Sequence, residues 1–173
     1  MSSTAGQSSG ILLIDALGRE TRHVHPQPAA AVVVLSPLRG RILLVEDGPD
    51  NQFLIERFLT KAGAQVEVAG HGGEALVRIE EAVRLGNDFD LIVTDMQMPE
   101  MDGYDMTRTL RTGGYERPIV ALTAHTLTGD REKCLAAGCD DYLTKPVCRP
   151  LLISRCQYWL ERRSTAVVHD RAS

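Results

Sequence analysis

The sequence predicts an α/β fold: a doubly wound, five-stranded parallel sheet with helices on both faces. Short apolar segments alternate along the chain with segments whose apolar residues recur at helical spacing. Several of the apolar segments are continuous runs, which is typical of strands buried on both faces. Acidic, hydroxyl and lysine residues follow directly after four of them, and ligands of such sheets bind beyond the carboxyl ends of the strands.

The five predicted strands are short and rich in apolar residues. The first of them, Ile42 to Val45, is an uninterrupted apolar run that ends at Glu46 and Asp47. The third ends at Asp95, the fourth at Thr123 and the fifth just before Lys145. In chain order the strands are residues 42–45, 65–69, 91–94, 119–122 and 141–144.

A helix is predicted after each strand. In the first, Phe53, Leu54, Phe58 and Leu59 recur at helical spacing and Gly63 ends the pattern. The last begins at Pro150, since proline is tolerated in a first turn. The helices are residues 49–62, 73–85, 104–111, 127–137 and 150–160. Strands that alternate with helices form parallel βαβ units, which is why the sheet is expected to be doubly wound.

The pattern places one domain at residues 39–162, flanked by two segments of different character. Residues 1–38 are a leader or linker, or the edge of an upstream domain, because the apolar runs Ile11–Ile14 and Ala29–Leu35 resemble strands without partners in their own segment. Residues 163–173 are too short and too polar to fold alone, so a flexible tail is expected.

Composition argues against several classes of function. The formal net charge of −4 disfavours nonspecific binding to nucleic acid. The longest apolar run, residues 29–35, is far shorter than the roughly 20 residues that span a bilayer. No secretion signal begins the chain, and the four cysteines match no zinc pattern. A cytoplasmic protein with free thiols and no membrane insertion is therefore expected, whereas its oligomeric state stays open.

The residues after the strand ends predict a site for phosphoryl chemistry. Three carboxylates, those of Glu46, Asp47 and Asp95, repel one another unless a cation joins them, and a set of oxygen ligands favours Mg²⁺. Asp95 is central and is the natural nucleophile, because a carboxylate can form an aspartyl phosphate. Lys145 and Thr123 can hold the oxygens of the transferring group. Any one of these residues alone would be an ordinary solvated loop residue; their occurrence in order after four apolar strands predicts the site.

Four segments carry a resemblance to a known family. They are ILLVEDGPDNQ (42–52), LIVTDMQMPEMDGYD (91–105), PIVALTAH (118–125) and GCDDYLTKP (138–146). The chain, from about Arg41 to Leu160, resembles a response-regulator receiver domain of two-component signalling. The residues of the second and third segments are most similar to those of receivers carried by hybrid sensor histidine kinases. The resemblance implies a flavodoxin-like strand order 2-1-3-4-5, and a histidine kinase or histidine phosphotransfer protein as partner.

The resemblance also assigns roles to individual residues. Asp95 matches the phosphoacceptor, Glu46 and Asp47 the acidic metal pair, and the backbone carbonyl of Gln97 a further metal ligand. Thr123 matches the switch hydroxyl, Tyr142 the switch aromatic, Lys145 the phosphate-binding lysine and Pro146 the proline after a cis peptide bond. Gly48 departs from the family, which usually has a polar residue such as asparagine there; we expect this to change the loop more than the metal site.

Two side chains are candidates for controlling the lifetime of an aspartyl phosphate. Gln97 and His125 each lie two residues beyond a site residue, on loops expected to flank the phosphate. An amide at position 97 can orient water without acting as a strong base. An ordinary rim residue is the alternative explanation for both, and for His125 the two explanations have about equal weight.

Other functions remain as alternatives. A receiver domain of a hybrid histidine kinase is preferred, and a stand-alone single-domain response regulator comes second. Neither turns over a substrate, so no enzyme in that sense is expected, and any kinase activity would lie outside this chain. A haloacid-dehalogenase-type phosphatase also forms an aspartyl phosphate, but it needs a second aspartate where Gln97 stands. A structural scaffold would not need three acids and a lysine.

Overall fold

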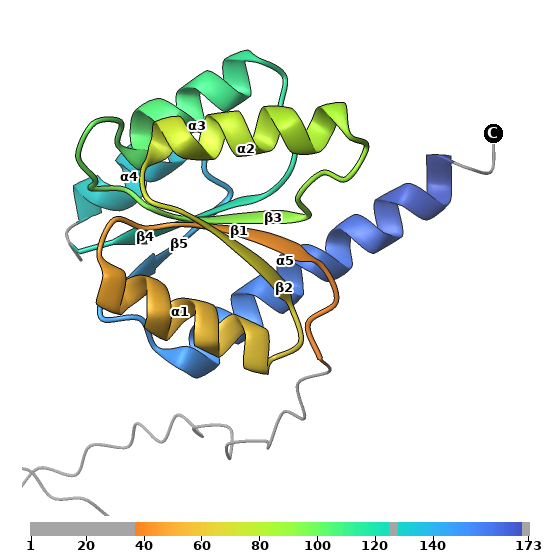
Figure 1. Cartoon of the computed structure of the whole chain (residues 1–173), viewed down its shortest axis with the longest axis horizontal. Helices are drawn as coiled ribbons and strands as arrows, with labels where there is room; N and C mark the ends of the chain where they lie inside the picture. The colour runs from red at the N-terminus through yellow and green to blue at the C-terminus, as the bar shows by residue number, and fades with distance from the viewer. Residues whose placement is uncertain (1–36, 125–127, 171–173) are drawn as a thin grey trace, which may run out of the picture. The chain divides into compact units, whose positions relative to one another are not determined.

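The computed structural model describes residues 37–124 and 128–170. Its described elements alternate between strand and helix throughout (Figure 1). They are β1 (Arg41–Val45), α1 (Pro49–Lys61), β2 (Gln65–Ala69), α2 (Gly72–Arg84), β3 (Leu91–Asp95), α3 (Gly103–Thr112), β4 (Ile119–Thr123), α4 (Thr128–Ala137), β5 (Asp141–Thr144) and α5 (Arg149–Asp170).

The strands form one parallel sheet in the order β2-β1-β3-β4-β5, which confirms the predicted fold class and strand order. The register pairs Val45 of β1 with Ala69 of β2 and with Thr94 of β3. At the other side, Asp95 pairs with Leu122, and Thr123 pairs with Thr144. The carboxyl ends of all five strands therefore lie at one edge of the sheet.

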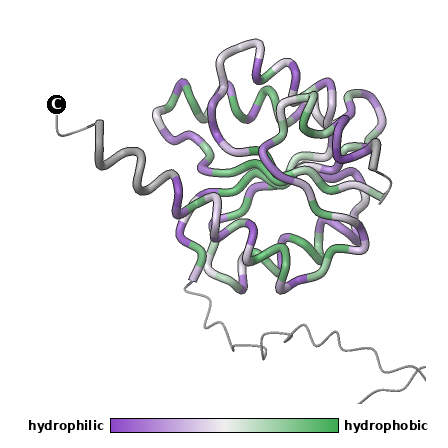
Figure 2. Tube along the Cα trace, turned by 180° about the vertical axis from the view of Figure 1, so that it is seen from behind, coloured by the Kyte–Doolittle hydropathy of each residue, from purple (hydrophilic) through white to green (hydrophobic). Residues whose placement is uncertain are grey.

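Helices cover both faces of the sheet. On one face, α2, α3 and α4 pack over a core that contains Ile79, Phe89 and Met106 (Figure 1). On the other, α1 and α5 pack over a core that contains Ile55 and Leu152. Every residue of β3 and β4 is buried, and the apolar residues concentrate along the central strands (Figure 2). Burying one large apolar side chain contributes about 1.5 to 3 kcal/mol, so these two cores hold the strand ends in fixed positions.

The predicted boundaries of the last helix were wrong at its carboxyl end. Helix α5 was expected to end at Leu160, but its backbone continues as a helix through Asp170. The flexible tail expected over residues 163–173 stays a prediction. Residues 161–170 contain no glycine or proline that would stop a helix, and their polarity alone does not end one. The expected strands Ile11–Ile14 and Ala29–Leu35 lie outside the described residues.

Two further observations bear on the chain as a whole. Among the helices of residues 37–124 and 128–170, none is long and apolar enough to cross a membrane. The four cysteines are free thiols, of which Cys134, Cys139 and Cys156 are buried and Cys148 is exposed.

Candidate functional site

The sheet brings the predicted site residues to its carboxyl edge. Glu46 and Asp47 follow β1, Asp95 ends β3, Thr123 ends β4, and Lys145 follows β5. The three strands β1, β3 and β4 are neighbours in the sheet, with β5 beside β4. Residues from distant parts of the sequence therefore meet above the ends of the central strands. Strand β2 contributes none of them and, as expected, is an outer strand of the sheet.

An acidic cluster forms the centre of this region. Carboxylate oxygens of Glu46, Asp47 and Asp95 all lie within 4.8 Å of one another. Glu46 is 1% exposed and Asp95 is 5% exposed, whereas Asp47 faces solvent. Buried carboxylates so close together need positive charge nearby to be stable.

Lys145 supplies one such charge. Its Nζ lies 2.7 Å from Glu46 Oε2 and 2.5 Å from Asp95 Oδ2. Burial acts to lower the pKa of Lys145, but the hydrogen bonds to Asp95 and Glu46 outweigh it and raise that pKa above its ordinary value. The lysine is thus held as an ammonium between two carboxylates.

The loop after β3 fixes Asp95. The backbone N–H of Gln97 donates to Asp95 Oδ1 at 3.0 Å, while the Gln97 side chain is exposed. Beneath the loop, a Cβ at Gly103 would lie 2.3 Å from the backbone oxygen of Asp95. Only glycine allows α3 to begin this close to the strand end.

Thr123 and Lys145 are tied together through the backbone. The N–H of Lys145 donates to the Thr123 carbonyl at 2.8 Å, and Thr123 is 3% exposed. Tyr142 is partly buried against the core on the α3 and α4 face of the sheet. The peptide bond between Lys145 and Pro146 is cis, as expected. The switch roles of Thr123 and Tyr142 remain predictions, and His125 lies outside the described residues.

Two residues at this site were missed as functional candidates. Asn51 and Gln52, in the first turn of α1, direct their side-chain amides toward Glu46. Both lie in the first of the four segments that carry the family resemblance, residues 42–52. Helical periodicity does not indicate that a side-chain amide of the first turn contacts a residue before the helix. Two consecutive amides shortly after an acidic pair were the available signal.

The donor set fits a hard divalent cation. Three carboxylates and one ammonium have formal charges of −3 and +1, so the group keeps a formal charge of −2. Asp47 is exposed and its carboxylate lies within 4.8 Å of the two buried ones, which suits oxygen coordination of a small ion. A further positive charge at this position would offset the remaining repulsion.

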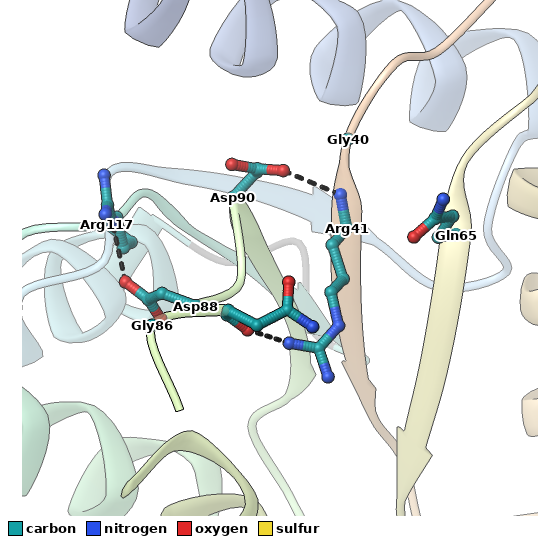
Figure 3. A pocket seen from close by; sticks show the side chains of 8 residues that line it. Gly40, Arg41, Gln65, Gly86, Asp88, Asp90 and Arg117 are labelled. Carbon is teal, nitrogen blue, oxygen red and sulfur yellow. Dashed lines mark hydrogen bonds and ion pairs between the residues drawn. The ribbon is translucent and has the colours of Figure 1, made fainter. Parts of the chain in front are cut away.

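A pocket lies elsewhere in the domain. Its volume is about 390 Å³, and its lining includes Gly40, Gln65 and Asp90 near the starts of strands, together with residues 86–88 of the loop between α2 and β3 (Figure 3). Its charged groups are paired, since Arg117 contacts Asp88 at 2.7 Å. It lies at the opposite edge of the sheet from the acidic cluster and shares no residue with it.

Comparison with known proteins agrees with this geometry. Residues 42–157 match the family described as the response regulator receiver domain. The chain is 42% identical over 118 residues to the sensor protein GacS of Pseudomonas syringae pv. syringae, covering 65% of this chain and 12% of GacS. It is 37% identical over 139 residues to hybrid signal transduction histidine kinase I of Dictyostelium discoideum, covering 75% of this chain and 8% of that protein. The chain thus spans a small part of these curated relatives.

A solved structure gives the same result in three dimensions. The receiver domain of a sensor histidine kinase from Pseudomonas aeruginosa PAO1, solved with a magnesium ion coordinated in its active site cleft, is 42% identical, with a TM-score of 0.61. The match covers 70% of this chain and 98% of that one. Together with the five-stranded sheet and its acidic edge, these similarities show that the chain belongs to the response regulator receiver domain family, homologous to the receivers of hybrid histidine kinases.

Proposed function

We propose that this receiver accepts a phosphoryl group on Asp95 from a phosphohistidine, with Mg²⁺ held by Glu46, Asp47 and Asp95. The observation that carries the proposal is the acidic cluster spanned by Lys145, which contacts both Glu46 and Asp95. Receiver domains of phosphorelays interact with histidine kinases or histidine phosphotransfer proteins. The matched relatives support its assignment as the receiver of a hybrid histidine kinase. We expect it to act in the cytoplasm.

The chemistry follows from the side chains present. A carboxylate oxygen of Asp95 attacks phosphorus, the bond between phosphorus and the imidazole nitrogen breaks, and that nitrogen keeps the electron pair. The donor imidazole carries a proton on its other ring nitrogen, so the products are an acyl phosphate on Asp95 and a neutral imidazole on the donor. Phosphoryl transfer depends mainly on positioning and on neutralising the charge of the equatorial oxygens.

The residues around Asp95 divide this work. Lys145 already lies beside Asp95 Oδ2, so its ammonium can pair with a phosphoryl oxygen once the carboxylate is phosphorylated. Thr123, at the end of the adjacent strand, can donate its hydroxyl to a second oxygen. When bound, Mg²⁺ supplies positive charge beside the carboxylates and the phosphoryl oxygens, with the Gln97 carbonyl as an additional ligand. The phosphoryl group stays on Asp95, so the transfer by itself does not make the domain an enzyme that turns over a substrate.

The test is direct labelling with a small acyl phosphate donor. Wild-type protein incubated with the donor and Mg²⁺ should gain one phosphoryl group, which mass spectrometry of its peptides should place within residues 91–105. Asp47→Ala, which removes one carboxylate of the cluster, should bind Mg²⁺ more weakly by calorimetry and label more slowly. A phosphoryl group on another residue, or unchanged Mg²⁺ affinity in Asp47→Ala, would contradict the proposal. Continuous hydrolysis of added phosphomonoesters would favour a phosphatase instead.

A further inference from the structure

The two oxygens of the Glu46 carboxylate have different partners. Oε2 accepts from Lys145 Nζ at 2.7 Å, on the side of Asp95. Oε1 accepts from Asn51 Nδ2 at 3.0 Å and, at 3.4 Å, from the backbone N–H of Gly48. Because Glu46 is 1% exposed, water contributes little to the orientation of this group, and these contacts set it.

The contacts to Oε1 come from the start of α1. Gly48 is the residue before the helix, and no side chain caps the helix there. Asn51 instead turns back past Gly48 to the Glu46 side chain, and the neighbouring Gln52 donates its amide to the Glu46 carbonyl at 2.5 Å. One amide therefore holds the carboxylate while the next holds the backbone of the same residue.

Gly48 leaves the space that this arrangement uses. A Cβ at position 48 would lie 3.2 Å from Glu46 Oε1 and 3.4 Å from Asn51 Nδ2. Because position 48 has no side chain, the Asn51 amide has room to reach Glu46 Oε1. A negative charge at the start of a helix is also favourable, which adds to the stability of Glu46 in this position.

The same division of partners occurs at Asp95. Its Oδ1 accepts from the backbone N–H of Gln97, and its Oδ2 accepts from Lys145. Both buried acids therefore have one oxygen held by an amide and the other facing the shared ammonium. This arrangement presents one oxygen of each acid to the space between them.

We propose that Asn51 is a positioning residue for the cation site: by holding Oε1 it keeps Glu46 Oε2 directed at the shared centre. The inference rests on the proposed function, in which a divalent cation binds this cluster. Without the Asn51 amide, Oε1 would keep only the longer contact from the Gly48 N–H, so the rotation of the carboxylate would be less restricted. Ordering it again would cost part of the free energy of cation binding.

A purely structural role makes a different prediction. If Asn51 only stabilised the start of α1, its removal would lower the free energy of unfolding and leave the affinity of the folded protein for Mg²⁺ unchanged. The two roles are therefore separated by measuring Mg²⁺ affinity and thermal stability on the same variants. Asn51 is exposed, so its replacement should be tolerated by the fold.

The experiment titrates the whole chain with Mg²⁺ alone, by calorimetry, without a phosphoryl donor. Asn51→Leu, which keeps approximate size but removes the donor, should weaken Mg²⁺ binding by about five- to tenfold. Asn51→Gln restores an amide and should recover most of the affinity. Asn87→Leu is the matched control, because Asn87 is exposed and lies in the loop between α2 and β3, at the opposite edge of the sheet; it should bind Mg²⁺ like wild type.

A second comparison tests whether Asn51 acts through Glu46. In a Glu46→Ala background there is no carboxylate to orient, so adding Asn51→Leu should not weaken Mg²⁺ binding further. If Glu46→Ala does not fold, the recovery by Asn51→Gln decides the question alone. Equal Mg²⁺ affinity in wild type and Asn51→Leu would overturn the positioning role while leaving the cation site intact. Absence of Mg²⁺ binding in wild type would instead overturn the proposed function.

Discussion

Lys145 Nζ lies 2.5 Å from Asp95 Oδ2, although the strands that carry these residues to the site, β3 and β5, are not adjacent in the sheet. Asp95 ends β3 and Lys145 follows β5, so the lysine side chain reaches across the end of β4. Thr123 ends β4 directly between them, and its carbonyl accepts from the Lys145 N–H. The residue expected to be the switch hydroxyl, Thr123, therefore ends the strand that lies between those of Asp95 and Lys145.

Removing the Thr123 hydroxyl should separate phosphorylation from its structural response. Thr123→Ala should still accept a phosphoryl group on Asp95, because the acidic cluster and Lys145 remain. It should lack the change in amide hydrogen exchange over α4, β5 and α5 that wild type shows on phosphorylation, since no hydroxyl at position 123 would follow the phosphoryl oxygens. Thr109→Ala on the exposed surface of α3 is the control. Equal exchange changes in Thr123→Ala and wild type would assign the switch to another residue.

Gln97 should affect the lifetime of the phosphorylated state. Its side chain is exposed while its N–H holds Asp95 Oδ1, so a larger apolar side chain can shield the phosphate without disturbing that bond. Gln97→Leu should slow the loss of phosphate after donor removal by about two- to tenfold, a change of up to roughly 1.4 kcal/mol in the barrier. Gln65→Leu, at the start of β2, should decay like wild type. Identical decay in Gln97→Leu would show that water reaches the phosphate by another route.

Gly103 should tolerate no side chain. A Cβ there would lie 2.3 Å from the Asp95 carbonyl oxygen and 2.9 Å from Met96 Cα, and both are backbone atoms that cannot rotate away. Gly103→Ala should lower the free energy of unfolding by about 2 to 3 kcal/mol in urea titrations. Gly113→Ala, where the nearest atoms lie at 3.4 Å and φ is −77°, should change it by less than about 1 kcal/mol. Similar values for the two variants would contradict the close approach of α3 to β3.

Buried thiols should make the protein less stable at alkaline pH. Burial raises the pKa of Cys156 from 9.0 to about 12. The thiol therefore ionises more readily in the unfolded chain, and the free energy of unfolding should fall as pH rises from about 9 toward 12. Cys156→Ala should remove up to about 1.4 kcal/mol per pH unit from that slope. The control Cys148→Ala removes an exposed thiol and should leave the slope of unfolding free energy against pH unchanged. An unchanged slope in Cys156→Ala would show that this thiol titrates alike in both states.

Much of the fold could be predicted from the sequence because its strands are continuous apolar runs with polar ends. The bounds of the strands 65–69 and 141–144 agree with the structure, and those of the other three differ by one residue at one end. The end of α5 could not be predicted, since the residues after Leu160 have neither a core-facing pattern nor a helix-stopping residue. Periodicity describes how a helix packs and does not mark the end of a helix where no stop signal follows.

The site was predictable to the level of which residues meet, but not how they touch. Strand ends in a parallel sheet place Glu46, Asp95 and Lys145 at one edge, which the sequence order alone indicates. The rotation of the Glu46 carboxylate depends on Asn51 and on the absent side chain at Gly48, and these act through the geometry of one helix start. Such local contacts have no periodic signal, so they appear only in the structure.

Transfer from a phosphohistidine donor to wild type and to Asp95→Asn tests the central proposal most directly. The asparagine keeps the shape of the side chain and removes the nucleophilic charge, so Asp95→Asn should fold normally and take up no labelled phosphoryl group. Wild type and the control Asp105→Asn, on the exposed surface of α3, should each take up one group per chain. Labelling of Asp95→Asn to the wild-type level would contradict the assignment of Asp95 as the phosphoacceptor.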